Sequence, residues 1–115
     1  MARQVTVFCT IQIEGAHFWK DCPLAEVDYL KDRHRHVFHI KAYQTVSHSD
    51  RDVEFICLKH DILHYLRVEY FREASFLHEF DGMSCEMIAN ELIDRFNLSS
   101  CEVNEDGENG AIVTA

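Results

Sequence analysis

The sequence predicts an α+β fold in which an antiparallel sheet of four strands carries two helices on one face. Two patterns lead to this prediction: apolar side chains alternate with polar ones near both ends of the chain, and they recur at helical spacing across its middle. A third observation sets the number of domains. The 115 residues are 47% hydrophobic and include one proline, which indicates a single folded domain over residues 1–115.

Two strands are expected in the first part of the chain. Residues 5–13 alternate apolar and polar side chains and lead directly to His17. Residues 18–31 lack a clean periodicity and predict a connection with room for one helical turn. A second strand is expected over residues 36–46, and His34 would lie on its core face, because side chains two apart on a strand point the same way.

Two helices are expected next. A polar turn over residues 47–52 offers three candidate N-caps for an amphipathic helix that runs to about Tyr70. The second helix has Ser84 as its expected N-cap and Glu86 in its first turn, where the helix dipole favours an acid. Asn97 is the expected end of this helix.

Two short strands complete the expected sheet. Alternating residues over 101–105 and an apolar run over 111–113 predict these strands, and Asp-Gly and Asn-Gly pairs within residues 106–110 predict the hairpin turn between them. Phe8 and Tyr43 are expected on the face away from the helices, and the sheet would have free edges. We therefore expect a homo-oligomer in which neighbouring copies close the sheets into a barrel.

The net charge of −9 and the composition limit the classes of function. Such a charge disfavours binding to nucleic acid polymers or to an anionic membrane surface. No apolar stretch approaches the roughly 20 residues of a membrane-spanning helix, so we expect no membrane partner and a cytoplasmic location. The five cysteines show no Cys-x-x-Cys spacing, which favours reduced thiols over a disulfide framework or a structural zinc knuckle.

Three histidines, His17 and the pair His34-Arg35-His36, are the strongest candidates for a functional site. His34 and His36 would project from one face of a strand, about 6.5 Å apart along it, so that both imidazoles can share one metal ion. If His17 ends a neighbouring strand, a third nitrogen converges and the fourth position stays free, as catalytic zinc requires. The alternative is that the His-x-His pair is only a polar strand face.

Five segments of the chain occur in the order, and with the residue types, of a known family. They are Ile13-Glu14-Gly15-Ala16-His17, His34-Arg35-His36-Val37-Phe38, Val53-Glu54-Phe55-Ile56-Cys57-Leu58-Lys59, Ser84-Cys85-Glu86-Met87-Ile88-Ala89, and Glu105. They resemble segments of the tunnelling-fold enzymes of the 6-pyruvoyl-tetrahydropterin synthase and 6-carboxy-tetrahydropterin synthase group, and the resemblance covers most of the chain. It implies a ββααββ tunnelling fold with Zn²⁺ as cofactor and with sites at subunit interfaces.

The resemblance also implies roles for individual residues. His17, His34 and His36 match the three zinc ligands of the family, and Glu105 matches the glutamate that anchors the pterin ring. An ionised carboxylate suits this role, because it accepts two parallel hydrogen bonds from the N–H edge of a pterin or guanine ring. The alternative for Glu105 is a surface acid beside a turn.

Three further residues are candidates for substrate binding. Ser84 and Glu86 lie in the segment that resembles the family's Thr-x-Glu-Asn-Ile-Ala. Arg35 stands where the family has a glycine between the two histidines, and Arg35, Arg33 or both would reach an anionic group such as phosphate. The alternative is an exposed strand end on which these arginines balance nearby acids.

The candidates for proton transfer depart from the family pattern. The family uses a cysteine shortly before the His-x-His pair, assisted by an Asp-His dyad. His78 matches the histidine of the dyad, but Leu77 stands where the aspartate is expected. Cys22 is the nearest candidate thiol, although it lies 12 residues before His34, and it is either catalytic or a structural thiol.

Two functions from different classes follow. The first is a zinc-dependent lyase that acts on a dihydropterin triphosphate by elimination and proton transfer, with Cys22 and His78 as catalytic residues. The second is a non-catalytic tunnelling-fold module that binds or sequesters a purine-type or cyclic nucleotide. The replacement of the dyad aspartate by Leu77 and the displaced Cys22 favour the second function.

Overall fold

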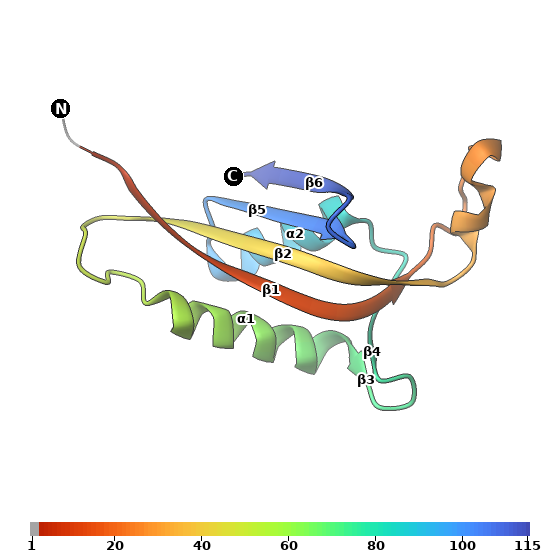
Figure 1. Ribbon diagram of the computed structural model, residues 1–115, viewed down its shortest axis with the longest axis horizontal. Coiled ribbons are helices and arrows are strands. Elements are labelled where there is room, and N and C mark those ends of the chain that lie inside the picture. Colours follow the sequence, from red (N-terminus) through yellow and green to blue (C-terminus); the bar gives the residue numbers. More distant parts are fainter. Residues whose placement is uncertain (1–2) are drawn as a thin grey trace.

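The computed structural model describes residues 3–115, and over these residues the chain forms a mixed six-stranded sheet with two α-helices and one 3₁₀ helix (Figure 1). The elements in order are β1 (Val5–His17), η1 (Ala25–Lys31), β2 (His34–Val46), α1 (Phe55–Tyr70), β3 (Phe71–Arg72), β4 (Leu77–Asp81), α2 (Cys85–Phe96), β5 (Ser100–Glu105) and β6 (Asn109–Thr114). The α+β class is confirmed. The expected sheet of four antiparallel strands is wrong, because β3 and β4 extend it to the order β3-β4-β1-β2-β5-β6.

The long strands β1 and β2 form the centre of the sheet. They pair antiparallel over their whole length, and at one end of the pair His17 lies opposite His34. β1 continues past Ile13, where the sequence predicts its end, and so carries His17 within the sheet. β5 and β6 form the expected hairpin, except that Asn109 and Gly110, which were expected in the turn, already belong to β6.

The hairpin of β3 and β4 was not expected from the sequence. β4 runs parallel to β1, with Gly15 opposite His78, and this pairing makes the sheet mixed. Both strands are short, and Phe80 is the one fully buried side chain of β4, so no alternating pattern marks them. Pairing of β4 with β1 and of β3 with β4, rather than a local preference, therefore accounts for these strands.

Both α-helices lie where the sequence predicts them, but α1 has a different cap. Its N-cap is Glu54, whose carboxylate accepts a hydrogen bond from the first turn, so the cap does not come from the polar turn over residues 47–52. In α2 the predicted cap is confirmed, since the Ser84 hydroxyl accepts from the backbone N–H of Met87. α2 also ends at the predicted Asn97, which has a φ of 53°. Within residues 3–115, no helix has both the length and the apolar character needed to cross a membrane.

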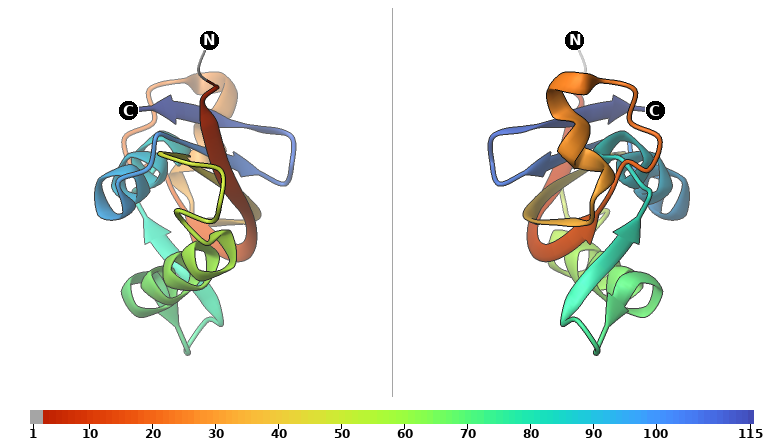
Figure 2. Two further views of the ribbon diagram at one scale, coloured as in Figure 1. Left: turned by 90° about the vertical axis from the view of Figure 1, so that its left-hand side faces the viewer. Right: turned by 90° about the vertical axis from the view of Figure 1, so that its right-hand side faces the viewer.

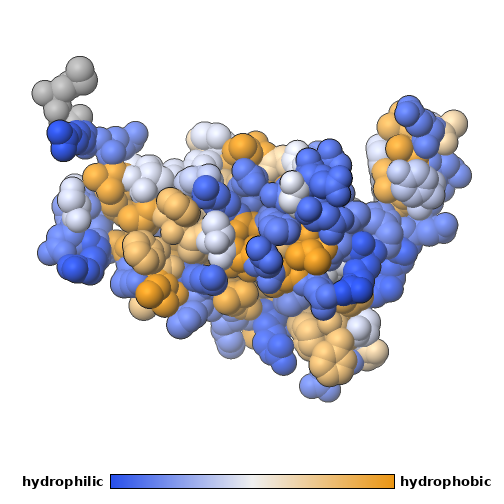
Figure 3. Space-filling view, viewed as in Figure 1, coloured by the Kyte–Doolittle hydropathy of each residue, from blue (hydrophilic) through white to orange (hydrophobic). Residues whose placement is uncertain are grey.

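One hydrophobic core joins both helices to one face of the sheet. Its largest fully buried side chains are Phe38, Phe80, Ile11, Ile40, Ile62, Leu66, Ile88, Leu92 and Val103. The opposite face is open in this chain, and Phe8, which contacts Tyr43 there, is 50% exposed. The surface in Figure 3 mixes hydrophobic and hydrophilic residues, and the views along the long axis in Figure 2 show how strongly the sheet twists. The single chain is therefore an open sheet and not a closed barrel.

Candidate metal centre

The side chains of His17, His34, His36 and Glu105 meet at one end of the sheet. β1 supplies the first, β2 supplies the next two, and β5 supplies Glu105. The histidine ring centroids are 4.6, 5.4 and 5.0 Å apart, and one ligand atom from each of the four side chains lies within 4.8 Å of the others. The predicted convergence of the three histidines is confirmed, and a carboxylate joins them. Such a group can hold a metal ion.

The alternation of side chains along β2 and a glycine on β1 account for the position of these histidines. On β2, His34 and His36 continue the core face that carries Phe38, whose ring packs edge-on against His36. Gly15 lies opposite His36 on β1, and a Cβ atom at this position would come within 2.9 Å of the rings of both Phe38 and Phe80. Gly15 therefore lets the aromatic core reach the base of the histidine cluster.

The Nδ1 atom of each histidine is held by an oxygen atom. His17 Nδ1 lies 2.9 Å from the Met83 carbonyl, His34 Nδ1 lies 2.8 Å from the Asp32 carbonyl, and His36 Nδ1 lies 2.7 Å from Asp106 Oδ2. Carbonyl and carboxylate oxygens accept hydrogen bonds, so Nδ1 is the donor in all three rings. In a neutral ring the Nε2 atom then has a free lone pair, and this is the arrangement that partners outside the ligand sphere impose on metal-binding histidines.

Two of the Nε2 atoms are buried without a hydrogen-bond partner. These are the Nε2 atoms of His17 and His36, even though Glu105 oxygens lie 2.8 and 3.5 Å from them. The 2.8 Å separation between His17 Nε2 and Glu105 is within ion-pair distance, but the two groups are not oriented to form a hydrogen bond. A buried polar atom without a partner costs about 1–3 kcal/mol. A cation at the centre of the group would satisfy both nitrogens and the carboxylate together, so the residues fit a metal ion.

Glu105 and His17 influence each other electrostatically. Burial alone would lower the pKa of His17, but the Glu105 carboxylate and the Met83 carbonyl outweigh this effect and raise the pKa. His17 in turn is the main reason that the pKa of Glu105 is lowered. A proton therefore competes with a metal for this pair, because a histidine must be neutral to bind a metal.

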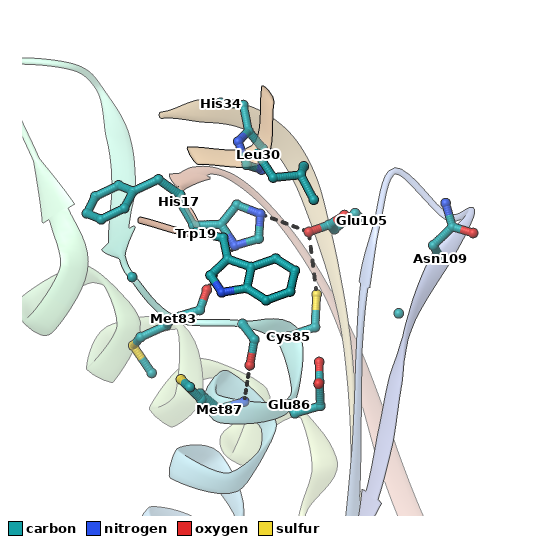
Figure 4. A pocket seen from close by; sticks show the side chains of 14 residues that line it. His17, Trp19, Leu30, His34, Met83, Cys85, Glu86, Met87, Glu105 and Asn109 are labelled. Carbon is teal, nitrogen blue, oxygen red and sulfur yellow. Dashed lines mark hydrogen bonds and ion pairs between the residues drawn. The ribbon is translucent and has the colours of Figure 1, made fainter. Parts of the chain in front are cut away.

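A pocket of about 470 Å³ opens beside the metal centre (Figure 4). The residues that line it are His17, Phe18, Trp19, Leu30, His34, Gly82, Met83, Ser84, Cys85, Glu86, Met87, Glu105, Asn109 and Gly110. This volume is in the range of small-molecule sites. The first turn of α2 thus faces the ends of β1, β2 and β5 across a space that suits a ligand.

Three of the four predicted substrate contacts line this pocket, namely Ser84, Glu86 and Glu105. Arg35 does not, because it projects from the opposite face of β2 and pairs with Glu14.

The two predicted catalytic residues lie elsewhere in the chain. Cys22 is buried in the connection next to η1, where its thiol faces the carbonyl oxygens of Leu24 and Val27 at 3.8 and 3.7 Å. His78 lies on β4 with Nδ1 3.1 Å from the Glu14 carbonyl, and burial lowers its pKa. Neither residue is among those that line the pocket.

Three residues of the site were missed by sequence reasoning. Cys85 lines the pocket with Sγ 3.8 Å from Glu105 Oε2, and burial followed by the negative charge of Glu105 raises the pKa of this thiol to about 12. Asp106 was interpreted only as a turn residue, although it adjoins Glu105. Trp19 stands two residues after His17, which is the one signal that could have marked it.

A comparison with protein-family models found no match for this chain, and a comparison with curated proteins found none either. The candidate site therefore rests on its geometry.

Proposed function

We propose that the chain binds a zinc ion through His17, His34 and His36 and holds a pterin- or purine-like ring in the adjoining pocket. The observation that carries the proposal is the arrangement of the three rings, because each Nδ1 faces an oxygen and one ligand nitrogen of each ring lies within 4.8 Å of those of the other two. A set of imidazole nitrogens suits zinc, which they bind at about 2.0–2.1 Å. The resemblance to the tetrahydropterin synthases supports the same metal and the same kind of ring.

Different residues of the site bind the ring and orient the metal ligands. Glu105 accepts hydrogen bonds from the N–H edge of the ring, and Ser84 and Glu86 line the pocket from α2. The Met83 carbonyl and the Asp106 carboxylate hold the ligand histidines in orientation. Zinc, when bound, supplies a Lewis acid that polarises an oxygen of the ligand.

One version of this function is an enzyme of the tetrahydropterin synthase type. It would be a zinc-dependent lyase that acts on a dihydropterin triphosphate by elimination and proton transfer. This reaction requires a thiol or an imidazole within reach of the substrate. Because Cys22 and His78 do not line the pocket of their own chain, they would act in a site that a second copy of the chain completes.

The second version is a module that captures a purine-type or cyclic nucleotide without converting it. The position of the proton carriers favours this version. Cys22 and His78 lie outside the pocket, and Cys85, the thiol that does line it, has a pKa of about 12 and is protonated at neutral pH.

Metal analysis of the purified protein tests the part that both versions share, and we expect one zinc ion per chain. Incubation of the zinc protein with dihydroneopterin triphosphate, with release of phosphate as the readout, then separates the versions. Turnover that Cys22→Ala or His78→Ala abolishes supports the enzyme, and retention of a nucleotide without product supports the capture module. A protein that purifies without zinc and whose stability is unchanged by His36→Ala would contradict both.

A further inference from the structure

Trp19 is an exposed aromatic side chain at the mouth of the metal pocket. It is the only tryptophan of the chain, it follows β1 by two residues, and its side chain is 45% exposed. Figure 4 shows its indole among the residues that line the pocket. A large aromatic ring left half in water offers a flat surface on which a planar ligand can stack.

The backbone around this tryptophan is well held. The N–H of Trp19 donates to the Leu30 carbonyl at 2.7 Å, and the Trp19 carbonyl accepts from the N–H of Cys22 at 3.2 Å. Leu30, Met83 and Met87 also line the pocket. The indole therefore belongs to an apolar wall whose backbone is fixed before a ligand arrives, which lowers the entropic cost of binding.

The polar part of the pocket is acidic. Glu86 and Glu105 line it, and none of the 11 lysines and arginines of the chain is among the described residues that do. Four basic residues are close in the sequence to residues that line the pocket. Three of them form ion pairs with other acids, Lys31 with Asp28, Arg33 with Glu79 and Arg35 with Glu14, and the fourth, Lys20, does not line the pocket. No lysine or arginine is thus placed to neutralise an anion in the pocket.

The N-terminus of α2 also faces the pocket and would favour an anion, but its partial positive charge is too small to offset the acidic side chains. A helix N-terminus carries about half a positive charge, whereas Glu86 and Glu105 are two full negative charges. Even a bound divalent cation would bring the pocket only close to neutrality. A phosphate monoester carries about −1.5 to −2 charges at pH 7 and would remain largely uncompensated there.

We propose that Trp19 stacks on a flat heterocycle of the pterin or purine type that carries no phosphate group, and that the N–H edge of this ring faces Glu105. The inference rests on the proposed function, since the ring lies beside the same metal centre. It narrows the ligand to a free base, a nucleoside or an unphosphorylated pterin. It therefore argues against a triphosphate as the ligand of the single chain.

The test uses the zinc-loaded full chain and two matched pairs of probes, neopterin with neopterin monophosphate and guanosine with guanosine 5′-monophosphate. Dissociation constants are measured by calorimetry, and the fluorescence of Trp19, the only tryptophan, reports directly on stacking. We expect the unphosphorylated member of at least one pair to bind, to quench this fluorescence, and to bind at least about tenfold more tightly than its phosphorylated partner.

Variants of Trp19 provide a second measure of stacking. Trp19→Ala is expected to weaken binding of the ring by about 5- to 150-fold, the range of base stacking on aromatic side chains, whereas Trp19→Phe retains most of the affinity. Tyr29→Ala, which removes an exposed aromatic ring that does not line the pocket, is the matched control and should change nothing. Zinc content and circular dichroism establish that each variant is folded.

The inference is overturned by binding without quenching, by binding of the phosphorylated probe as tight as that of its partner, or by equal affinity in Trp19→Ala and the wild type. If Trp19→Ala fails to fold, the quenching measured in the wild type and the affinity of the Trp19→Phe variant still test whether Trp19 stacks on the ring. A zinc-loaded chain that binds only the phosphorylated probes overturns this inference alone, and one that binds no ring at all also removes the ring from the proposed function while the zinc site stands. A chain that binds no zinc overturns the proposed function and this inference with it.

Discussion

The Nδ1 atom of His36 lies 2.7 Å from Asp106 Oδ2, and the other carboxylate oxygen of Asp106 accepts a hydrogen bond from the backbone N–H of Val37 at 2.8 Å. One carboxylate therefore fixes both the ring of His36 and the strand that carries it. The backbone N–H of Asp106 also donates to the Val37 carbonyl, so the β5–β6 turn is tied to β2 at the metal centre. This turn thus controls the orientation of a candidate metal ligand.

Replacing Asp106 should weaken metal binding without removing a ligand. We expect Asp106→Ala to lower zinc affinity by about 10- to 100-fold, which is the usual effect of losing the hydrogen-bond partner of a ligating histidine. Asp106→Asn should have a smaller effect because its amide oxygen can still accept the hydrogen bond. Competition with a chromogenic chelator measures the affinity. Glu108→Ala, in the same turn but without a contact to a histidine, is the control, and an equal loss in both variants would contradict the assigned role.

Gly15 should tolerate no side chain, although it lies in a regular strand. Gly15→Ala places a Cβ atom within 2.9 Å of Phe38 and Phe80, and such overpacking costs about 1–3 kcal/mol of unfolding free energy. Because Phe38 supports the ring of His36, zinc affinity should fall as well. Denaturant unfolding and zinc titration measure the two effects. Gly82→Ala is the matched control, since its nearest neighbour would be 3.9 Å away, and a similar loss there would show that the space around Gly15 is not the cause.

Removing a ligand histidine should abolish the stabilisation by zinc. At a free zinc concentration 1,000 times the dissociation constant, binding adds about 4 kcal/mol to the unfolding free energy of the wild type. We expect His34→Ala to lose this increment, and thermal unfolding with and without zinc measures it. His39→Ala is the control on the same strand, because His39 projects from the opposite face of β2. If both variants keep the increment, the histidine cluster is not the zinc site.

Much of the fold and the convergence of the three histidines could be predicted from the sequence, because they depend on local periodicity. Alternation over β1 and β2, helical spacing in α1 and α2, and the cap at Ser84 are properties of neighbouring residues. The same alternation places His34 and His36 on one face, and the antiparallel pairing brings His17 opposite His34.

The remaining features depend on contacts between distant parts of the chain. β4 forms because it pairs with β1, and the Asp106 contact to His36 joins residues 70 positions apart. Cys22 and His78 could not be placed from the sequence, because whether they reach the pocket depends on the path of the η1 connection and on the parallel β4 strand. Apart from its position two residues after His17, Trp19 also could not be assigned from the sequence, since its place in the site depends on the pocket that α2 completes.

The ion pair between Arg33 and Glu79 should make stability depend on pH. Arg33 Nε lies 2.8 Å from Glu79 Oε1, and this arginine, together with the Ser75 hydroxyl, lowers the pKa of Glu79. A carboxylate whose pKa is lower in the folded state stabilises the fold above its unfolded pKa of about 4.3, and this contribution is lost as the pH falls through the folded pKa.

We expect Glu79→Gln to lower the unfolding free energy at pH 7 by about 1 kcal/mol or less, since half of the Arg33 side chain is exposed, and to have a smaller effect at pH 3. Urea unfolding at the two pH values measures the difference. Glu14→Gln removes a more exposed pair with Arg35 and should cost less at pH 7. An equal cost of Glu79→Gln at both pH values would mean that the charge is not responsible.

Glu105 is placed to act either as a fourth metal ligand or as the acceptor for a ligand ring, and Glu105→Gln separates these roles. Our proposal assigns it to the ring. We therefore expect the variant to keep one zinc ion per chain through His17, His34 and His36, and to lose affinity for guanosine or neopterin by about tenfold or more, since hydrogen bonds to a charged acceptor contribute about 1.5–3 kcal/mol. Glu86→Gln, a second acid of the pocket, is the control for a general effect of charge. If Glu105→Gln instead loses zinc while Glu86→Gln keeps it, the carboxylate belongs to the metal, and the ring must be held by other groups of the pocket.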